Sequence, residues 1–137
     1  MTNEDHPGKI LIVDDNAENR LLLSSQLKME GYTILQANGG LEGLEKAHAE
    51  NPDIILLDVM MPDIYGFEVC KRLKNDPATR LIPVIMVTAL RDTQYKIQGF
   101  EVGADEFLSR PHVREELLVR VRTLIQLKRA RVRLEEE

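Results

Sequence analysis

Five short apolar segments recur along this chain, and they constrain its fold more than any other feature of the sequence. They are Ile10–Val13, Thr33–Gln36, Ile54–Leu57, Val84–Val87 and Glu106–Leu108. Most are continuous apolar runs rather than alternating ones, which is typical of strands buried on both faces. The segments between them carry apolar residues at helical spacing. This alternation predicts an α/β fold, a doubly wound five-stranded parallel sheet with five helices on its two faces.

The 137 residues have the length of one domain with one core. We expect three segments, an N-terminal tail over 1–8, a domain over 9–126 and a helical extension over 127–137. The last helix is predicted from Val113 to about Leu134, which is longer than a small sheet requires. Beyond the domain, Leu127, Ala130 and Leu134 continue an apolar stripe. The stripe predicts pairing with another helix, or a linker to an output domain.

Charge and hydropathy exclude several classes of protein. The formal net charge is -5, and no basic cluster lies beside aromatic residues before the last helix, so we expect no direct nucleic-acid binding. No apolar run reaches the roughly 18 residues that cross a bilayer, and the N-terminus lacks the pattern of a signal peptide. The lone Cys70 cannot form an internal disulfide, which fits a reducing compartment. We therefore expect a cytoplasmic protein without a membrane partner.

Polar side chains follow four of the five predicted strands directly. The first strand ends in Asp14 and Asp15, the third in Asp58, the fourth in Thr88, and the fifth runs into Arg110. Ligands bind at the carboxyl ends of the strands in such a sheet. Carboxylates that converge there would repel each other by about 4 kcal/mol per pair at close range. A divalent cation with oxygen ligands relieves this repulsion, and Mg²⁺ suits an open site without histidine or cysteine ligands.

This arrangement predicts phosphoryl chemistry at Asp58. Its carboxylate is expected to point out of the sheet as a nucleophile, with Thr88 and Arg110 near the oxygens of a bound phosphoryl group. Each residue alone has an ordinary explanation: Asp15, followed by Asn16, as a helix cap, Thr88 as a strand residue, Arg110 as a surface charge. Their joint position at the ends of strands in one sheet favours a functional site.

Four motifs carry a resemblance to a known family. They read Ile-Val-Asp14-Asp15, Leu-Leu-Asp58-Val-Met-Met-Pro62 with Gly66 after it, Val-Thr88-Ala89 and Ser109-Arg110-Pro111. Together they resemble the receiver domains of two-component response regulators, which have the CheY-like, flavodoxin-like fold. The resemblance spans nearly the whole chain up to about Leu127. It implies a phosphorylation-controlled signalling switch rather than an enzyme with an external substrate.

The resemblance also implies roles for single residues. Asp58 would accept a phosphoryl group from a phosphohistidine on a sensor kinase or phosphotransfer protein. Mg²⁺ would be bound by Asp15, Asp58 and the backbone carbonyl of Met60, with Asp14 assisting through water. Thr88 and Phe107 would form the switch, and Arg110 would precede a cis-proline. Phosphorylation would then control an output domain, a partner or a homodimer.

Two departures from the family pattern leave alternatives open. The family has lysine where this chain has Arg110, and a planar guanidinium differs from a point charge at a tight site. The guanidinium either reaches the phosphoryl oxygens or points to solvent, and we expect a partly impaired switch. One alternative is therefore a receiver-like interaction or dimerisation module that does not use phosphorylation. Another is a metal-dependent phosphatase, although Met60 stands where such enzymes carry a second aspartate. The loop reads Ile64-Tyr65-Gly66 where the family often has Met-Asp-Gly.

Overall fold

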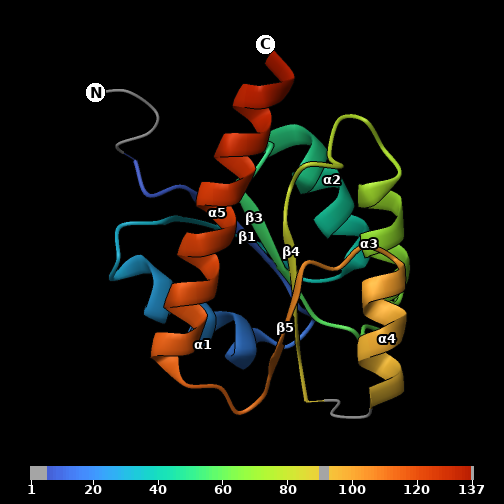
Figure 1. Cartoon of the computed structure of the whole chain (residues 1–137). Helices are drawn as coiled ribbons and strands as arrows, with labels where there is room; N and C mark the ends of the chain where they lie inside the picture. The colour runs from blue at the N-terminus through green and yellow to red at the C-terminus, as the bar shows by residue number, and fades with distance from the viewer. Residues whose placement is uncertain (1–5, 90–92, 137) are drawn as a thin grey trace.

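The computed structural model describes residues 6–89 and 93–136, so that residues 1–5 of the predicted tail and Glu137 of the predicted extension lie outside it. Strands and helices alternate along the chain (Figure 1). The strands are β1 (Lys9–Val13), β2 (Thr33–Ala37), β3 (Ile54–Leu57), β4 (Val84–Thr88) and β5 (Glu106–Ser109). The helices are α1 (Ala17–Lys28), α2 (Gly40–Glu50), α3 (Gly66–Lys74), α4 (Thr93–Glu101) and α5 (Arg114–Glu136). Every predicted strand is present, within one residue at each end.

The five strands form one parallel sheet in the order β2-β1-β3-β4-β5. Helices α1 and α5 cover one face and α2, α3 and α4 cover the other (Figure 1). Successive side chains of a strand point to opposite faces. In β1, Ile10 and Ile12 therefore pack in the core under α1 and α5, whereas Leu11 and Val13 pack in the core under α2 and α3. The predicted doubly wound α/β fold is confirmed.

The edge strand β2 departs from the expectation of strands buried on both faces. Thr33 is exposed, the next three residues are half-buried, and only Ala37 is fully buried. The reason is its place in the sheet, since an edge strand has a neighbour on one side only. Strands β1, β3 and β4 occupy the three central positions, and their apolar runs are buried as predicted.

Helix α5 buries Leu117, Val121 and Ile125 against the sheet. Beyond them, Leu127 is 44% exposed and Leu134 is 70% exposed. In Figure 1 the C-terminal end of α5 lies at the other side of the molecule from the edge where the strands end. In the described ranges, no helix combines the length and apolar character required to cross a bilayer.

Candidate functional site

Backbone hydrogen bonds continue past the strand ends and fix the residues that follow. The N–H of Asp14 donates to the carbonyl of Ala37 over 3.1 Å, and the N–H of Asp58 donates to Val13 over 3.0 Å. The N–H of Arg110 donates to the carbonyl of Thr88 over 2.8 Å. Because β1, β3, β4 and β5 are adjacent, these four residues lie at one edge of the sheet. The structure thus brings together the side chains that the strand ends predicted.

Three carboxylates form a cluster at this edge. Asp14, Asp15 and Asp58 each offer an oxygen, and the three oxygens lie within 4.8 Å of one another. Asp14 is only 1% exposed and Asp58 9%, whereas Asp15 is exposed. Oxygen ligands at this spacing fit a hard cation such as Mg²⁺, which retains water on its open side. The acidic cluster predicted from the sequence is therefore present, and its donor atoms suit the metal.

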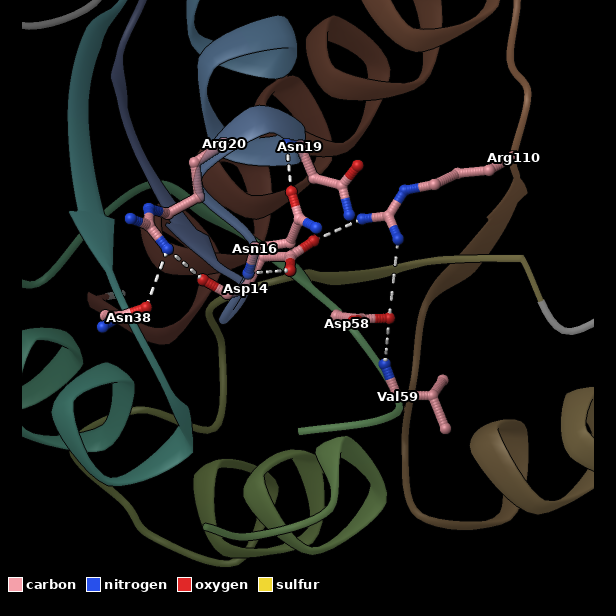
Figure 2. A network of polar contacts seen from close by, with 8 residues as sticks. All are labelled: Asp14, Asn16, Asn19, Arg20, Asn38, Asp58, Val59 and Arg110. Carbon is pink, nitrogen blue, oxygen red and sulfur yellow. Dashed lines mark hydrogen bonds and ion pairs between the residues drawn. The ribbon is translucent and has the colours of Figure 1, made fainter. Parts of the chain in front are cut away.

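Arg110 points into the cluster (Figure 2). Its Nη2 lies 2.5 Å from Oδ2 of Asp14, and its Nη1 lies 3.7 Å from Oδ1 of Asp58. The side chain is 20% exposed, so the guanidinium does not extend into solvent, and that alternative is wrong for this structure. The Arg110–Pro111 bond is cis, as the resemblance implied. The arginine thus places its positive charge beside Asp14 and Asp58, as expected of a lysine at this position.

The electrostatics of the cluster act most strongly on Asp58. The pKa of its carboxyl is raised from 3.8 to about 6, first by burial and then by the negative charge of Asp14. The guanidinium of Arg110 and the hydrogen bond from the N–H of Val59, 2.8 Å from Oδ1, lower this pKa. Removing water and gathering like charges both oppose ionisation. Ionised Asp58 therefore lowers the free energy of unfolding of the metal-free domain.

Thr88 and Phe107 lie where the switch was expected. Thr88 ends β4 and is 2% exposed. Phe107 pairs in register with Met86 of β4, and its ring is 7% exposed. The ring packs edge-on against Phe100 at a centroid distance of 5.3 Å. In this structure the aromatic side chain already faces inward, on the strand next to Thr88.

Helix capping at α1 settles an alternative that the sequence left open. Asn16 is the N-cap residue, and its Oδ1 accepts a hydrogen bond from the N–H of Asn19 over 3.0 Å. The N–H of Asn16 donates in turn to Oδ1 of Asp14 over 2.9 Å. Asp15 is therefore not needed as a cap, and its carboxylate stays with the cluster.

Sequence reasoning missed Arg20, a residue that holds the first acidic strand end. Its Nη1 donates to the backbone carbonyl of Asp14 over 2.6 Å and to Oδ1 of Asn38 over 3.0 Å (Figure 2). Its Nε donates to Oε1 of Gln36 over 3.2 Å. An arginine within a helix is ordinary in a sequence, so no local signal marked it. Asn38, directly after β2, shows that the second strand also ends in a polar residue with a role at this edge.

The fold and the site together define a class: a doubly wound α/β domain with buried and exposed carboxylates at the carboxyl edge of its sheet. A family model described as the response regulator receiver domain matches residues 10–122. The chain therefore belongs to the receiver domain family of response regulators. This confirms the family resemblance that the four sequence motifs indicated. The family consists of signalling domains rather than classical enzymes.

Named relatives agree with this assignment. The chain is 48% identical over 118 residues to the "DNA-binding dual master transcriptional regulator RpaA" of Synechocystis sp., covering 86% of this chain and 49% of that protein. It is 48% identical over 121 residues to the "Response regulator PleD" of Caulobacter vibrioides, covering 88% of this chain and 27% of that protein. The chain thus spans about half or less of these relatives.

Solved structures give the same result for the fold. The chemotaxis protein CheY4 of Vibrio cholerae superimposes with a TM-score of 0.80 at 34% identity, covering 85% of this chain and 97% of that chain. The beryllium-fluoride-activated DrrB receiver domain superimposes with a TM-score of 0.78 at 32% identity, covering 87% of this chain and 97% of that chain. The CheY-like fold expected from the sequence is confirmed.

Proposed function

We propose that this chain is a phosphorylation-dependent switch in which Asp58 accepts a phosphoryl group from a phosphohistidine. The observation that carries the proposal is the cluster itself: Asp58 lies within 4.8 Å of carboxylate oxygens of Asp14 and Asp15, and the guanidinium of Arg110 lies beside it. Carboxylates that can bind a metal ion, next to the positively charged guanidinium of Arg110, form a site suited to phosphoryl transfer. The position of Arg110 inside the site speaks against the phosphorylation-independent alternative.

Each residue of the site has a role in this chemistry. An oxygen of Asp58 forms the new bond to phosphorus, while the P–N bond of the donor breaks and its electron pair returns to the imidazole. Both contacts described above fall on Oδ1, so Oδ2 is the oxygen suited to attack. Arg110 then contacts the phosphoryl oxygens, and the buried hydroxyl of Thr88 donates to them. The movement of Thr88 is relayed to Phe107 on the neighbouring strand.

Magnesium is the metal that the ligand set suits. Asp15, Asp58 and the backbone carbonyl of Met60 would bind it, with Asp14 assisting through water. When bound, Mg²⁺ neutralises the carboxylates and the charge on the transferred group. In its absence, Arg110 neutralises part of the charge through Asp14 and Asp58. The chain itself supplies phosphotransfer and dephosphorylation, and we propose no external substrate.

A groove beside the site suits the docking of the phosphodonor. It has a volume of about 400 Å³ and connects α1 with the loops that follow β4 and β5. Its lining residues are Asn19, Leu22, Leu23, Ala89, Arg110, Pro111 and His112. Leu22 is 51% exposed at its rim, so an apolar surface of the donor can be buried next to Arg110. We propose that a sensor histidine kinase or phosphotransfer protein, in the cytoplasm, docks there.

Labelling with a small phosphodonor tests the proposal. Acetyl phosphate with Mg²⁺ should add one phosphoryl group to the wild-type chain, seen in the intact mass, and EDTA should abolish the addition. Asp58→Asn should acquire none because the nucleophile is gone, whereas Asp76→Asn, in the loop before β4 at the opposite edge of the sheet, should still be labelled. Equal labelling of Asp58→Asn and wild type would refute Asp58 as the acceptor.

The exposed stripe on α5 suggests how the switch is transmitted. Leu127 and Leu134 lie on the end of α5 with largely exposed side chains, and Ala130 between them is half-buried. We propose that this surface pairs with a second copy of the chain, or that the helix leads into an output domain. The relatives are long enough to contain such a domain beyond the matched region. Few heptads are available, so the pairing of the helix alone is weak.

Self-association should accordingly depend on activation. Beryllium fluoride with Mg²⁺ is expected to shift the chain from monomer toward dimer in multi-angle light scattering. Leu127→Gln combined with Leu134→Gln should reduce the shift because the apolar contact is lost, while Glu136→Gln, an exposed residue on the opposite side of the helix, serves as the control. A monomer at high concentration in both states would rule out the dimer.

A further inference from the structure

The loop between β3 and α3 carries Met60 and connects Asp58 to the next helix, but no side chain of the loop caps that helix. Helix α3 begins after Tyr65, which makes no side-chain capping bond. Tyrosine is not among the residue types that cap a helix N-terminus well. The chain therefore needs another means of holding this loop.

Asp63 provides a connection across the loop to α2. Its Oδ1 accepts a hydrogen bond from the N–H of Gly40 over 3.1 Å, and its Oδ2 accepts one from the N–H of Leu41 over 3.0 Å. Oδ1 also accepts from the N–H of Ile64 over 2.9 Å. Helix α2 has Gly39 at its N-cap position and no side-chain cap of its own. Asp63 thus caps α2 from a segment that lies 22 residues or more along the chain.

The glycines at the start of α2 make this approach possible. A Cβ on Gly39 would lie 2.9 Å from Oδ2 of Asp63, and a Cβ on Gly40 would lie 2.1 Å from Cγ2 of Ile64. At its other end the loop is closed by the N–H of Gly66, which donates to the carbonyl of Val59 over 2.8 Å. The segment around Met60 is therefore held between a fixed point at Val59 and a fixed point at Asp63.

The electrostatics of Asp63 agree with the geometry. The backbone hydrogen bond from Leu41 lowers the pKa of the Asp63 carboxyl most, and those from Gly40 and Ile64 lower it further. A carboxylate at a helix N-terminus also interacts favourably with the helix dipole. The contact is thus stronger when Asp63 carries its charge.

We propose that Asp63 is a positioning residue for the phosphorylation site: by capping α2 from the loop after β3, it holds the segment that carries Met60 beside Asp58. The inference rests on the proposed function, because Met60 matters only if its carbonyl binds the metal. Asp63 itself does not contact the acidic cluster in this role. Its loss should therefore weaken metal binding while leaving Asp58 able to accept a phosphoryl group.

Magnesium affinity of matched variants tests this role. In an NMR titration with MgCl₂, Asp63→Ala should bind Mg²⁺ about tenfold more weakly than wild type, in line with the effect of removing groups that orient ligands. Asp63→Asn should fall between the two, because its one amide oxygen is a neutral acceptor. Amide hydrogen exchange at Gly40 and Leu41 should accelerate in Asp63→Ala, which reports the lost cap directly.

Asp76→Ala is the matched control. Asp76 is also a carboxylate that accepts a backbone hydrogen bond, from the N–H of Ala78 over 2.9 Å, but its loop precedes β4 at the opposite edge of the sheet. Its loss should leave Mg²⁺ affinity unchanged. Wild-type affinity in Asp63→Ala, or an equal loss in Asp76→Ala, would overturn the positioning role while labelling of Asp58 upholds the switch. Failure of the wild-type chain to bind Mg²⁺ would instead overturn the proposed function, and the inference with it.

Discussion

Asp58→Asn should make the metal-free domain more stable by about 3 kcal/mol at pH 7.5, the equivalent of a pKa difference of roughly two units. In the folded protein, burial and the charge of Asp14 raise the pKa of Asp58 from 3.8 to about 6. Between these values the folded state binds more protons than the unfolded state, so stability falls as the pH rises through this window. An asparagine keeps the shape and has no charge to bury.

Urea unfolding in EDTA measures this effect. The difference between Asp58→Asn and wild type should be near its full size above pH 7 and should disappear below about pH 3, where Asp58 is protonated in both states. Asp15→Asn is the control, because Asp15 is exposed and contributes least to the shift of Asp58. Equal stability of Asp58→Asn and wild type at pH 7.5 would show that the folded domain holds the charge without cost.

Gly66→Ala should destabilise the domain by about 3 kcal/mol, the upper part of the usual range for overpacking. A Cβ at this position would lie 2.1 Å from the backbone oxygen of Asp58 and 2.9 Å from Cα of Val59. Both obstacles are backbone atoms, so the substitution forces the end of β3 or the start of α3 to move. Because Asp58 itself is displaced, phosphorylation by acetyl phosphate should fall together with stability.

Gly99→Ala gives the matched comparison within another helix. There a Cβ would lie 2.3 Å from Cζ of Phe107, which is the end of a side chain and can shift. Denaturant unfolding should show a smaller loss for Gly99→Ala, and labelling of Asp58 should persist. If Gly66→Ala unfolds and phosphorylates like wild type, the close packing of α3 against Asp58 is not required.

Part of this site could be predicted from local pattern. Continuous apolar runs identified the strands, and the rule that parallel strands share one carboxyl edge placed Asp14, Asp15, Asp58 and Thr88 together. The four motifs predicted the family. These results depend on residue type and spacing along the chain, which a sequence states directly, so the fold and the acidic cluster followed from it.

Other features depended on contacts between distant segments. Arg110 reaches Asp14 across 96 positions of sequence, and only the packing of β5 beside β4 shows that its guanidinium lies inside the site rather than in solvent. Likewise, Asp63 reads in the sequence as an ordinary turn residue, and Arg20 as an ordinary helix residue.

The sequence by itself determined the class of fold, the order of the elements and the residue types at the strand ends, because periodicity and strand-end position are local properties. Only the tertiary structure decided that Asp58 is buried with a raised pKa, that Asn16 rather than Asp15 caps α1, and that Asp63 caps α2. Burial and hydrogen-bond partners depend on which surfaces meet, and this is settled when the helices pack on the sheet.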